Sequence, residues 1–136
     1  HQLALLNTVI KKAKESERAY TCLKMAWIYR GKAESLPEDT PDRKEQIQEL
    51  QNQEKELLEN AYTGFEAAFS KESFPMCGMD EITVSYLLAE LARRIGRYEE
   101  SSRWISRVLI SREANERIKN RAREIKELLN KDMNRA

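Results

Sequence analysis

Residues 82–109 read ITVSYLLAELARRIGRYEESSRWISRVL, and this stretch decides the fold. Apolar and small residues recur there at steps of three, four and seven on both sides of Gly96, which places them on one stripe of each of two helices. They are Leu88, Ala89, Ala92 and Ile95 before the glycine, and Ser101, Trp104, Ile105, Val108 and Leu109 after it. Since Ala89 and Ser101 are small, we expect the two backbones to approach closely. The pattern predicts a helical hairpin that turns at Gly96.

The whole chain has the composition of a helical protein. Its 136 residues are 40% apolar and 35% charged, with four glycines and three prolines. A chain of this length fits one domain that buries roughly two-thirds of its unfolded surface. β-branched residues are sparse and never alternate over a strand's length. We therefore predict an all-α domain over residues 1–136.

The charges and the cysteines exclude several classes of function. A net charge of +1 gives no global attraction to nucleic acid or to an anionic membrane. No apolar run approaches the ~18 residues of a membrane span. Cys22 and Cys77 are the only cysteines and His1 the only histidine, so neither a disulfide framework nor a zinc site is expected. We expect reduced thiols, a cytoplasmic location, and no metal or other cofactor.

The remaining helices are predicted from apolar spacing and cap residues. Leu3, Leu6, Ile10 and Ala13 predict a helix over 2–14; because it starts without Met inside a periodic run, we expect a fragment of a longer protein. A second helix, 17–30, is expected to follow an Ser16 N-cap and to end near Gly31. After a loop at 32–42, Thr40 and Pro41 predict the start of a helix over 41–70. Cap residues Asp80 and Asn115 are expected to begin the hairpin and a last helix.

Two tryptophans are expected in the core rather than as exposed anchors for a partner. Trp27 shares helical spacing with Tyr20, Leu23 and Ala26. Trp104 shares it with the apolar residues of the hairpin. Core packing explains both spacings, since a periodic apolar residue normally faces the interior of the protein.

The hairpin resembles a tetratricopeptide repeat, a helix–turn–helix unit of about 34 residues. The matching residues are Leu88, Ala89, Ala92, Gly96, Tyr98, Ser101, Ile105 and Val108. A split earlier copy is visible in Tyr20, Leu23, Ala26, Trp27 and Gly31 for its first helix, and in Ala61, Phe65 and Ala68 for its second. The resemblance implies a tetratricopeptide-like stack of antiparallel helix pairs (an α-α superhelix) of about five or six helices.

Three longer motifs resemble a narrower family. They are AWIYR at 26–30, ELLENAYTGFEAAF at 56–69 and YLLAELARRIGRYEES at 86–101. They are similar to the C-terminal half of an uncharacterised bacterial family, domain of unknown function 2225. The resemblance implies that full-length members carry paired CxxC motifs for zinc ahead of the helical half. This sequence contains no such motif.

The repeat positions predict a concave groove that binds a partner. Its lining residues would be Thr21, Met25, Ile28, Tyr29, Tyr86, Glu90, Arg93 and Arg94. The arginine pair beside Tyr86 could hold an acidic or extended segment. The alternative is that Glu90 forms ordinary intrahelical ion pairs with Arg93 and Arg94 at three- and four-residue spacing.

These patterns favour an interaction module over an enzyme. The sequence holds no histidine near a nucleophile, no glycine-rich phosphate loop and no HExxH. Bases at Arg117, Lys119, Arg121, Arg123 and Lys126 are interrupted by acids without interleaved aromatics, so nucleic acid is not expected. We predict a scaffold or adaptor that binds an unidentified protein or peptide. The alternative is a self-association domain, a homo-oligomer that positions a zinc-binding N-terminal part.

Overall fold

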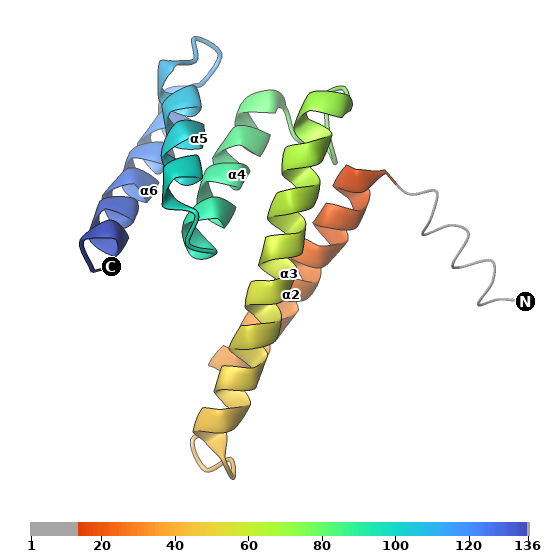
Figure 1. Cartoon of the computed structure of the whole chain (residues 1–136), viewed down its shortest axis with the longest axis vertical. Helices are drawn as coiled ribbons and strands as arrows, with labels where there is room; N and C mark the ends of the chain where they lie inside the picture. The colour runs from red at the N-terminus through yellow and green to blue at the C-terminus, as the bar shows by residue number, and fades with distance from the viewer. Residues whose placement is uncertain (1–13, 136) are drawn as a thin grey trace, which may run out of the picture. The chain divides into compact units, whose positions relative to one another are not determined.

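The computed structural model describes residues 14–135, and this part of the chain contains five α-helices and no strand. They are α2 (Glu15–Glu34), α3 (Arg43–Lys71), α4 (Glu81–Arg94), α5 (Tyr98–Ile110) and α6 (Glu116–Arg135) (Figure 1). The all-α prediction is confirmed. None of the described helices combines the length and apolarity needed to cross a membrane. The helix expected at 2–14 lies outside the described residues.

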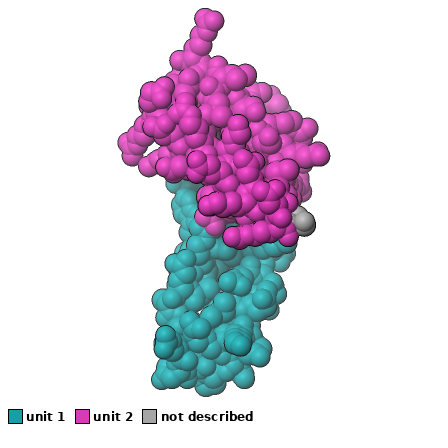
Figure 2. Space-filling model, turned by 90° about the vertical axis from the view of Figure 1, so that its left-hand side faces the viewer, with its two compact units in different colours: residues 1–68 teal, residues 69–136 magenta. Residues whose placement is uncertain are grey.

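The chain divides into two compact units, residues 1–68 and residues 69–136, which are coloured separately in Figure 2. The first unit holds α2 and nearly all of α3. The second holds the end of α3, the loop that follows it, and α4, α5 and α6. Each unit is described by itself below, and the single-domain expectation stays a prediction.

In the first unit α2 and α3 form an antiparallel pair (Figure 1). Ala19, near the start of α2, lies against Gly64, near the end of α3. Arg30, later in α2, donates a 2.7 Å hydrogen bond from Nε to Glu54, earlier in α3. A Cβ atom added at Gly64 would lie only 2.8 Å from the Ala19 Cβ. The two backbones therefore approach so closely that position 64 has no room for a side chain.

Helix α2 is longer than its sequence pattern predicted. Its N-cap is Lys14, and Ser16, the expected cap, is buried inside the first turn. The Glu17 carboxylate instead accepts a hydrogen bond from the Lys14 backbone N–H at 3.4 Å. Gly31 lies within the helix rather than at its end. The helix ends at Glu34, and the N–H of its C-cap Ser35 donates to the Gly31 carbonyl. The prediction failed because a single glycine is tolerated inside a helix.

The start of α3 also differs from expectation. Asp42 has a φ of 52°, so Pro41 is not the first helical residue and the helix begins at Arg43. The Gln46 side-chain amide donates to the Pro41 carbonyl at 2.8 Å. The loop between the two helices covers residues 35–42 rather than the expected 32–42, because α2 extends through Glu34.

Small residues, rather than the expected aromatic ones, form the buried face of α2. Ala19, Ala26 and Ala33, seven residues apart, are buried together with Leu23. Trp27 is 47% exposed, so the prediction of a core position for it is wrong. Successive residues of an α-helix point about 100° apart, so burying Ala26 turns Trp27 outward. Tyr20 is half-buried.

In the second unit local signals place the helix ends as the sequence predicted. Asp80 caps α4 by accepting a hydrogen bond from the Thr83 backbone N–H at 2.8 Å. Asn115 caps α6 in the same way, with the Ile118 N–H at 2.9 Å. Gly96 has a φ of 84°, a left-handed conformation that suits glycine, and the chain turns there between α4 and α5. The predicted hairpin is confirmed.

The hairpin closes where Ala89 meets the start of α5. Ser101 is fully buried, and its Oγ donates a 2.8 Å hydrogen bond to the Ala89 carbonyl oxygen. A larger residue at position 101 would hold the two backbones apart. The expected close approach of these two small residues is therefore confirmed.

Large apolar side chains hold α4, α5 and α6 together. The buried cluster consists of Ile82, Ala89, Ile105, Val108, Ala122, Ile125 and Leu129. Trp104 is half-buried against it, with its ring edge-on to Phe69 at a centroid distance of 4.9 Å. The prediction that Trp104 lies in the core is thus confirmed only in part. The Arg107 guanidinium lies 5.2 Å from the Phe69 ring and covers the outer side of this aromatic pair.

Candidate functional site

The eight residues expected to line a groove belong to two different helices and two different units. Thr21, Met25, Ile28 and Tyr29 lie on α2, and Tyr86, Glu90, Arg93 and Arg94 lie on α4. Each set can be placed within its own unit. That the two sets line one groove stays a prediction.

On α2, two of the four expected residues contribute to a pocket. Met25 and Tyr29 line a pocket of about 400 Å³ with residues from the middle of α3. Those residues are Glu49, Gln53, Glu56, Leu57 and Asn60. Ile28 is 57% exposed and lies outside this pocket, and the Thr21 hydroxyl is used within the helix, donating to the Glu17 carbonyl at 3.0 Å. Of the α2 set, therefore, only Met25 and Tyr29 share a pocket.

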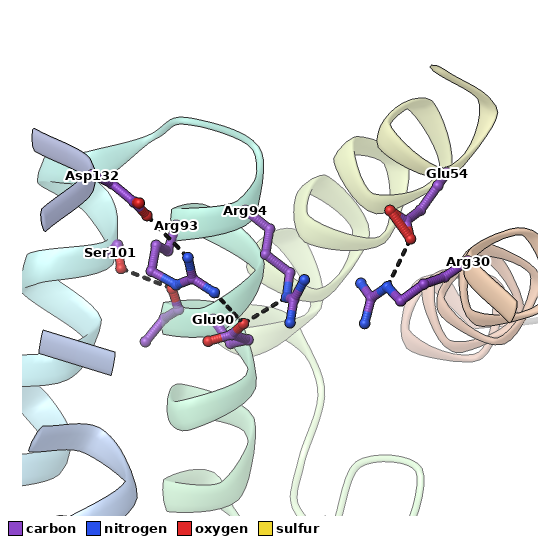
Figure 3. A network of polar contacts seen from close by, with 8 residues as sticks. Arg30, Glu54, Glu90, Arg93, Arg94, Ser101 and Asp132 are labelled. Atoms are coloured by element: carbon purple, nitrogen blue, oxygen red, sulfur yellow. Dashed lines mark hydrogen bonds and ion pairs between the residues drawn. The ribbon is translucent and has the colours of Figure 1, made fainter. Parts of the chain in front are cut away.

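On α4, the polar part of the expected set forms a closed network of ion pairs. Arg93 donates to Glu90 at 2.8 Å and to Asp132 of α6 at 2.9 Å, as Figure 3 shows. Arg94 donates to the same Glu90 oxygen. Burial acts to lower the pKa of Arg93, but its hydrogen bonds to Glu90 and Asp132 outweigh burial and raise the pKa. The intrahelical ion pairs that the spacing allowed are thus present, and Arg93 also ties α4 to α6.

Tyr86, the remaining α4 residue, lines a pocket between α4 and α6. The pocket has a volume of about 350 Å³ and is lined by Met79, Thr83, Tyr86, Leu87, Asn115, Arg117, Ile118 and Arg121. We call it the Tyr86 pocket. Burial and the nearby Glu90 charge raise the pKa of Tyr86, so its phenol keeps its proton at neutral pH. Its hydroxyl forms no hydrogen bond within residues 14–135 and is free to donate one.

The two arginines of this pocket were absent from the expected set. Arg117 and Arg121 are both exposed, and neither forms a hydrogen bond or ion pair within the described part of the chain. Their spacing of four residues places both on one face of α6. The four-residue spacing could have identified this face from the sequence, but it does not indicate which helix packs beside it. From the sequence, both arginines were identified only among the bases of the last helix.

The described residues offer no alternative site in the form of a cluster of metal-ligating side chains. No group of three or more His, Cys, Asp or Glu side chains within residues 14–135 is placed to hold a metal ion. Cys22 and Cys77, one in each unit, are not joined in a disulfide. The Tyr86 pocket is consequently the best-defined combination of apolar walls and uncommitted polar groups among the described residues.

The family resemblance seen in the sequence motifs is confirmed. A family model described as "Uncharacterized protein conserved in bacteria (DUF2225)" matches residues 1–129. Neither a curated protein nor a solved structure matches the chain. Because the family model covers almost the whole sequence, this chain belongs to the bacterial family DUF2225.

Proposed function

We propose that this chain is a non-enzymatic protein-interaction module with a tetratricopeptide-like arrangement of helix pairs. In this proposal the first helix of each pair presents a concave surface to an extended peptide or protein segment in the bacterial cytoplasm. The Tyr86 pocket carries the proposal. The hairpin geometry supports it as well, since Gly96 and the Ala89–Ser101 contact lie where a tetratricopeptide repeat has its turn and its closest helix approach.

The composition of the Tyr86 pocket is that of a small protein-binding surface. Met79, Leu87 and Ile118 are half-buried and supply an apolar floor. Arginines and a tyrosine surround it, and these residue types are enriched where proteins bind one another. A partner that covers the pocket would remove this apolar surface from water and could use the polar groups around it.

Site-specific crosslinking of the full-length protein in cells tests the proposal. A photoreactive amino acid at Leu87, inside the pocket, is expected to give a discrete crosslinked product. The same amino acid at Glu127, an exposed position of α6 outside the pocket, serves as the control. If both positions give the same products, or neither gives any, the pocket is not a partner-binding surface.

Self-association is the second candidate function, and the first unit supplies its supporting observation. Met25, Trp27 and Ile28 of α2 are 43%, 47% and 57% exposed, an apolar surface suited to a second copy of the chain. Such a dimer would serve to position a zinc-binding N-terminal part. Sedimentation across a concentration series tests it. A Trp27→Gln, Ile28→Gln variant is expected to remain monomeric where the original chain associates; a monomer at all concentrations for both would reject this function.

A further inference from the structure

We propose that the Tyr86 pocket selects an acidic partner segment, in which an Asp or Glu side chain binds Arg117 and Arg121 beside a large apolar side chain. This inference rests on the proposed interaction function and deepens it by stating the chemistry of the partner. Four observations carry it. Arg93 and Arg94 are paired with carboxylates of the second unit, whereas Arg117 and Arg121 are not; the Tyr86 hydroxyl has no partner among the described residues; and the pocket has an apolar floor.

The arginines that the sequence pattern singled out are already paired with carboxylates of the second unit. Arg93 has its two terminal nitrogens bound to Glu90 and Asp132, and its side chain is only 13% exposed. Arg94 is bound to Glu90 as well. A partner carboxylate would have to displace Glu90 or Asp132 before it could bind the terminal nitrogens of Arg93. This network therefore acts as a structural tie between α4 and α6 rather than as a receptor.

Arg117 and Arg121 offer what Arg93 and Arg94 do not. Both lie on the first two turns of α6, both are exposed, and neither has an ion-pair partner within residues 14–135. The nearby Glu116 carboxylate is paired with Arg123 at 3.7 Å. A guanidinium group presents a planar set of donors that matches a carboxylate in bidentate fashion. Two such groups one helical turn apart therefore favour an acidic partner and repel a basic one.

Tyr86 adds a donor to the same place. Its pKa is raised by burial and by Glu90; Arg121 acts in the opposite direction and Glu124 of α6 in the same one. The protonated phenol can donate a hydrogen bond to a partner carboxylate or carbonyl. Because the hydroxyl has no partner within the described residues, binding would satisfy a half-buried polar group that is otherwise left to water.

The apolar floor sets the second requirement on the partner. Met79 and Leu87 from the α4 side and Ile118 from the α6 side are each half-buried. A leucine, methionine or phenylalanine next to the acidic residue would cover them, which an acidic side chain by itself cannot do. The pocket should thus discriminate against segments that are acidic but lack an apolar residue.

Selection from a library of random peptides displayed on phage tests this inference, with the chain of residues 1–136 as the target. The expected result is enrichment of peptides that carry Asp or Glu beside Leu, Met or Phe. The best peptide, made synthetically, should lose about 10-fold or more in affinity on Arg117→Gln plus Arg121→Gln, because two charge-assisted contacts are removed. Its affinity should also fall as salt is raised.

A matched control separates the pocket from the general charge of α6. Arg123→Gln removes a positive charge from the same helix outside the pocket, and is expected to change the affinity less than about 2-fold. Equal losses for Arg123 and for the Arg117–Arg121 pair would overturn the inference. Enrichment of basic or uncharged peptides, or of none, would overturn it too. If Leu87 still crosslinks to a partner in those cases, the interaction function stands and only the acidic preference is wrong.

Discussion

Helix α2 of the first unit and helices α5 and α6 of the second bury opposite kinds of side chain. In α2 the buried residues are small apart from Leu23, and the larger Met25, Trp27 and Ile28 are exposed. In α5 and α6 the buried residues are mostly large, with Ile105, Ile125 and Leu129 at the centre. Helix α2 brings its backbone close to that of α3, although α3 itself buries the larger Leu58, Tyr62 and Phe65. Helices α5 and α6 instead contribute apolar volume to the cluster of the second unit.

This difference explains where a hydrophobic pattern is a reliable guide. A pattern of large apolar residues marks the buried face when the helices stand apart and need volume between them. When two helices are in close contact, alanine and glycine mark that face, and large residues are turned out. The two tryptophans, Trp27 in the first unit and Trp104 in the second, allow each unit to be followed separately by fluorescence in single-tryptophan variants.

Removing apolar volume from the second unit should have the largest effect. Ile105 is 2% exposed in the α4–α5–α6 cluster, and Ile105→Ala is expected to lower the free energy of unfolding by about 2–5 kcal/mol through the cavity it leaves. Urea denaturation followed by Trp104 fluorescence measures this. Ile110→Ala, at an 81% exposed position of the same helix, should stay within about 0.5 kcal/mol. Similar losses in both variants would contradict the cluster.

Adding a methyl group to the first unit tests the close approach of α2 and α3. Gly64→Ala would place a Cβ 2.8 Å from that of Ala19, whereas Gly31→Ala would meet no heavy atom within 4 Å. Both changes gain helix propensity, and this gain cancels when the two are compared. The Gly64 variant should therefore be less stable by about 1–3 kcal/mol, the usual cost of overpacking. Thermal and urea unfolding curves of equal stability would show that the helices can separate freely.

The cap of α4 should give a smaller and pH-dependent effect. Asp80→Ala removes the hydrogen bond from Thr83 and is expected to cost about 0.5–2 kcal/mol at neutral pH. The backbone and side-chain hydrogen bonds of Thr83 lower the pKa of Asp80 from its ordinary 3.8. Its contribution is thus complete above that value and is lost as the pH falls through the lower folded-state pKa.

Asparagine is the matched control for this cap, because it accepts the same hydrogen bond without a titrating group. Asp80→Asn should retain most of the stability at neutral pH and should lose less than the original chain on acidification. The test is to measure the free energies of unfolding of both proteins from neutral pH to below 3.8. An identical acid response of the two proteins would mean that Asp80 does not contribute to it.

The smallest effect is expected at the contact between Ser101 and Ala89 in the second unit. Ser101→Ala keeps the close approach to α4 but removes the 2.8 Å hydrogen bond to the Ala89 carbonyl. The expected loss is about 0.5–1.5 kcal/mol in denaturation experiments. Ser102→Ala, one residue further on and exposed, should change the stability by less than about 0.5 kcal/mol. A loss at Ser101 no greater than at Ser102 would assign the contact to packing alone.

Much of the candidate site could not be predicted from the sequence, because its residues come from different helices. Tyr86, Glu90, Arg93 and Arg94 were identified from repeat positions, and all four lie on α4. That Arg93 binds Asp132, 39 residues away, could not be predicted, and this contact removes it from the partner-binding groups. Arg117 and Arg121 become part of the pocket only because the first turns of α6 lie beside those of α4.

The sequence by itself determined the features that depend on neighbours along the chain. These are the helical class, the turn at Gly96, the caps at Asp80 and Asn115 and the small pair at Ala89 and Ser101. Such features need only residues a few positions apart, so a local pattern suffices to predict them. The tertiary structure alone decided that Ala26 rather than Trp27 faces inward, and that Arg117 and Arg121 join Tyr86. Those outcomes depend on how closely and at which positions distant helices pack, and no single helix carries that information.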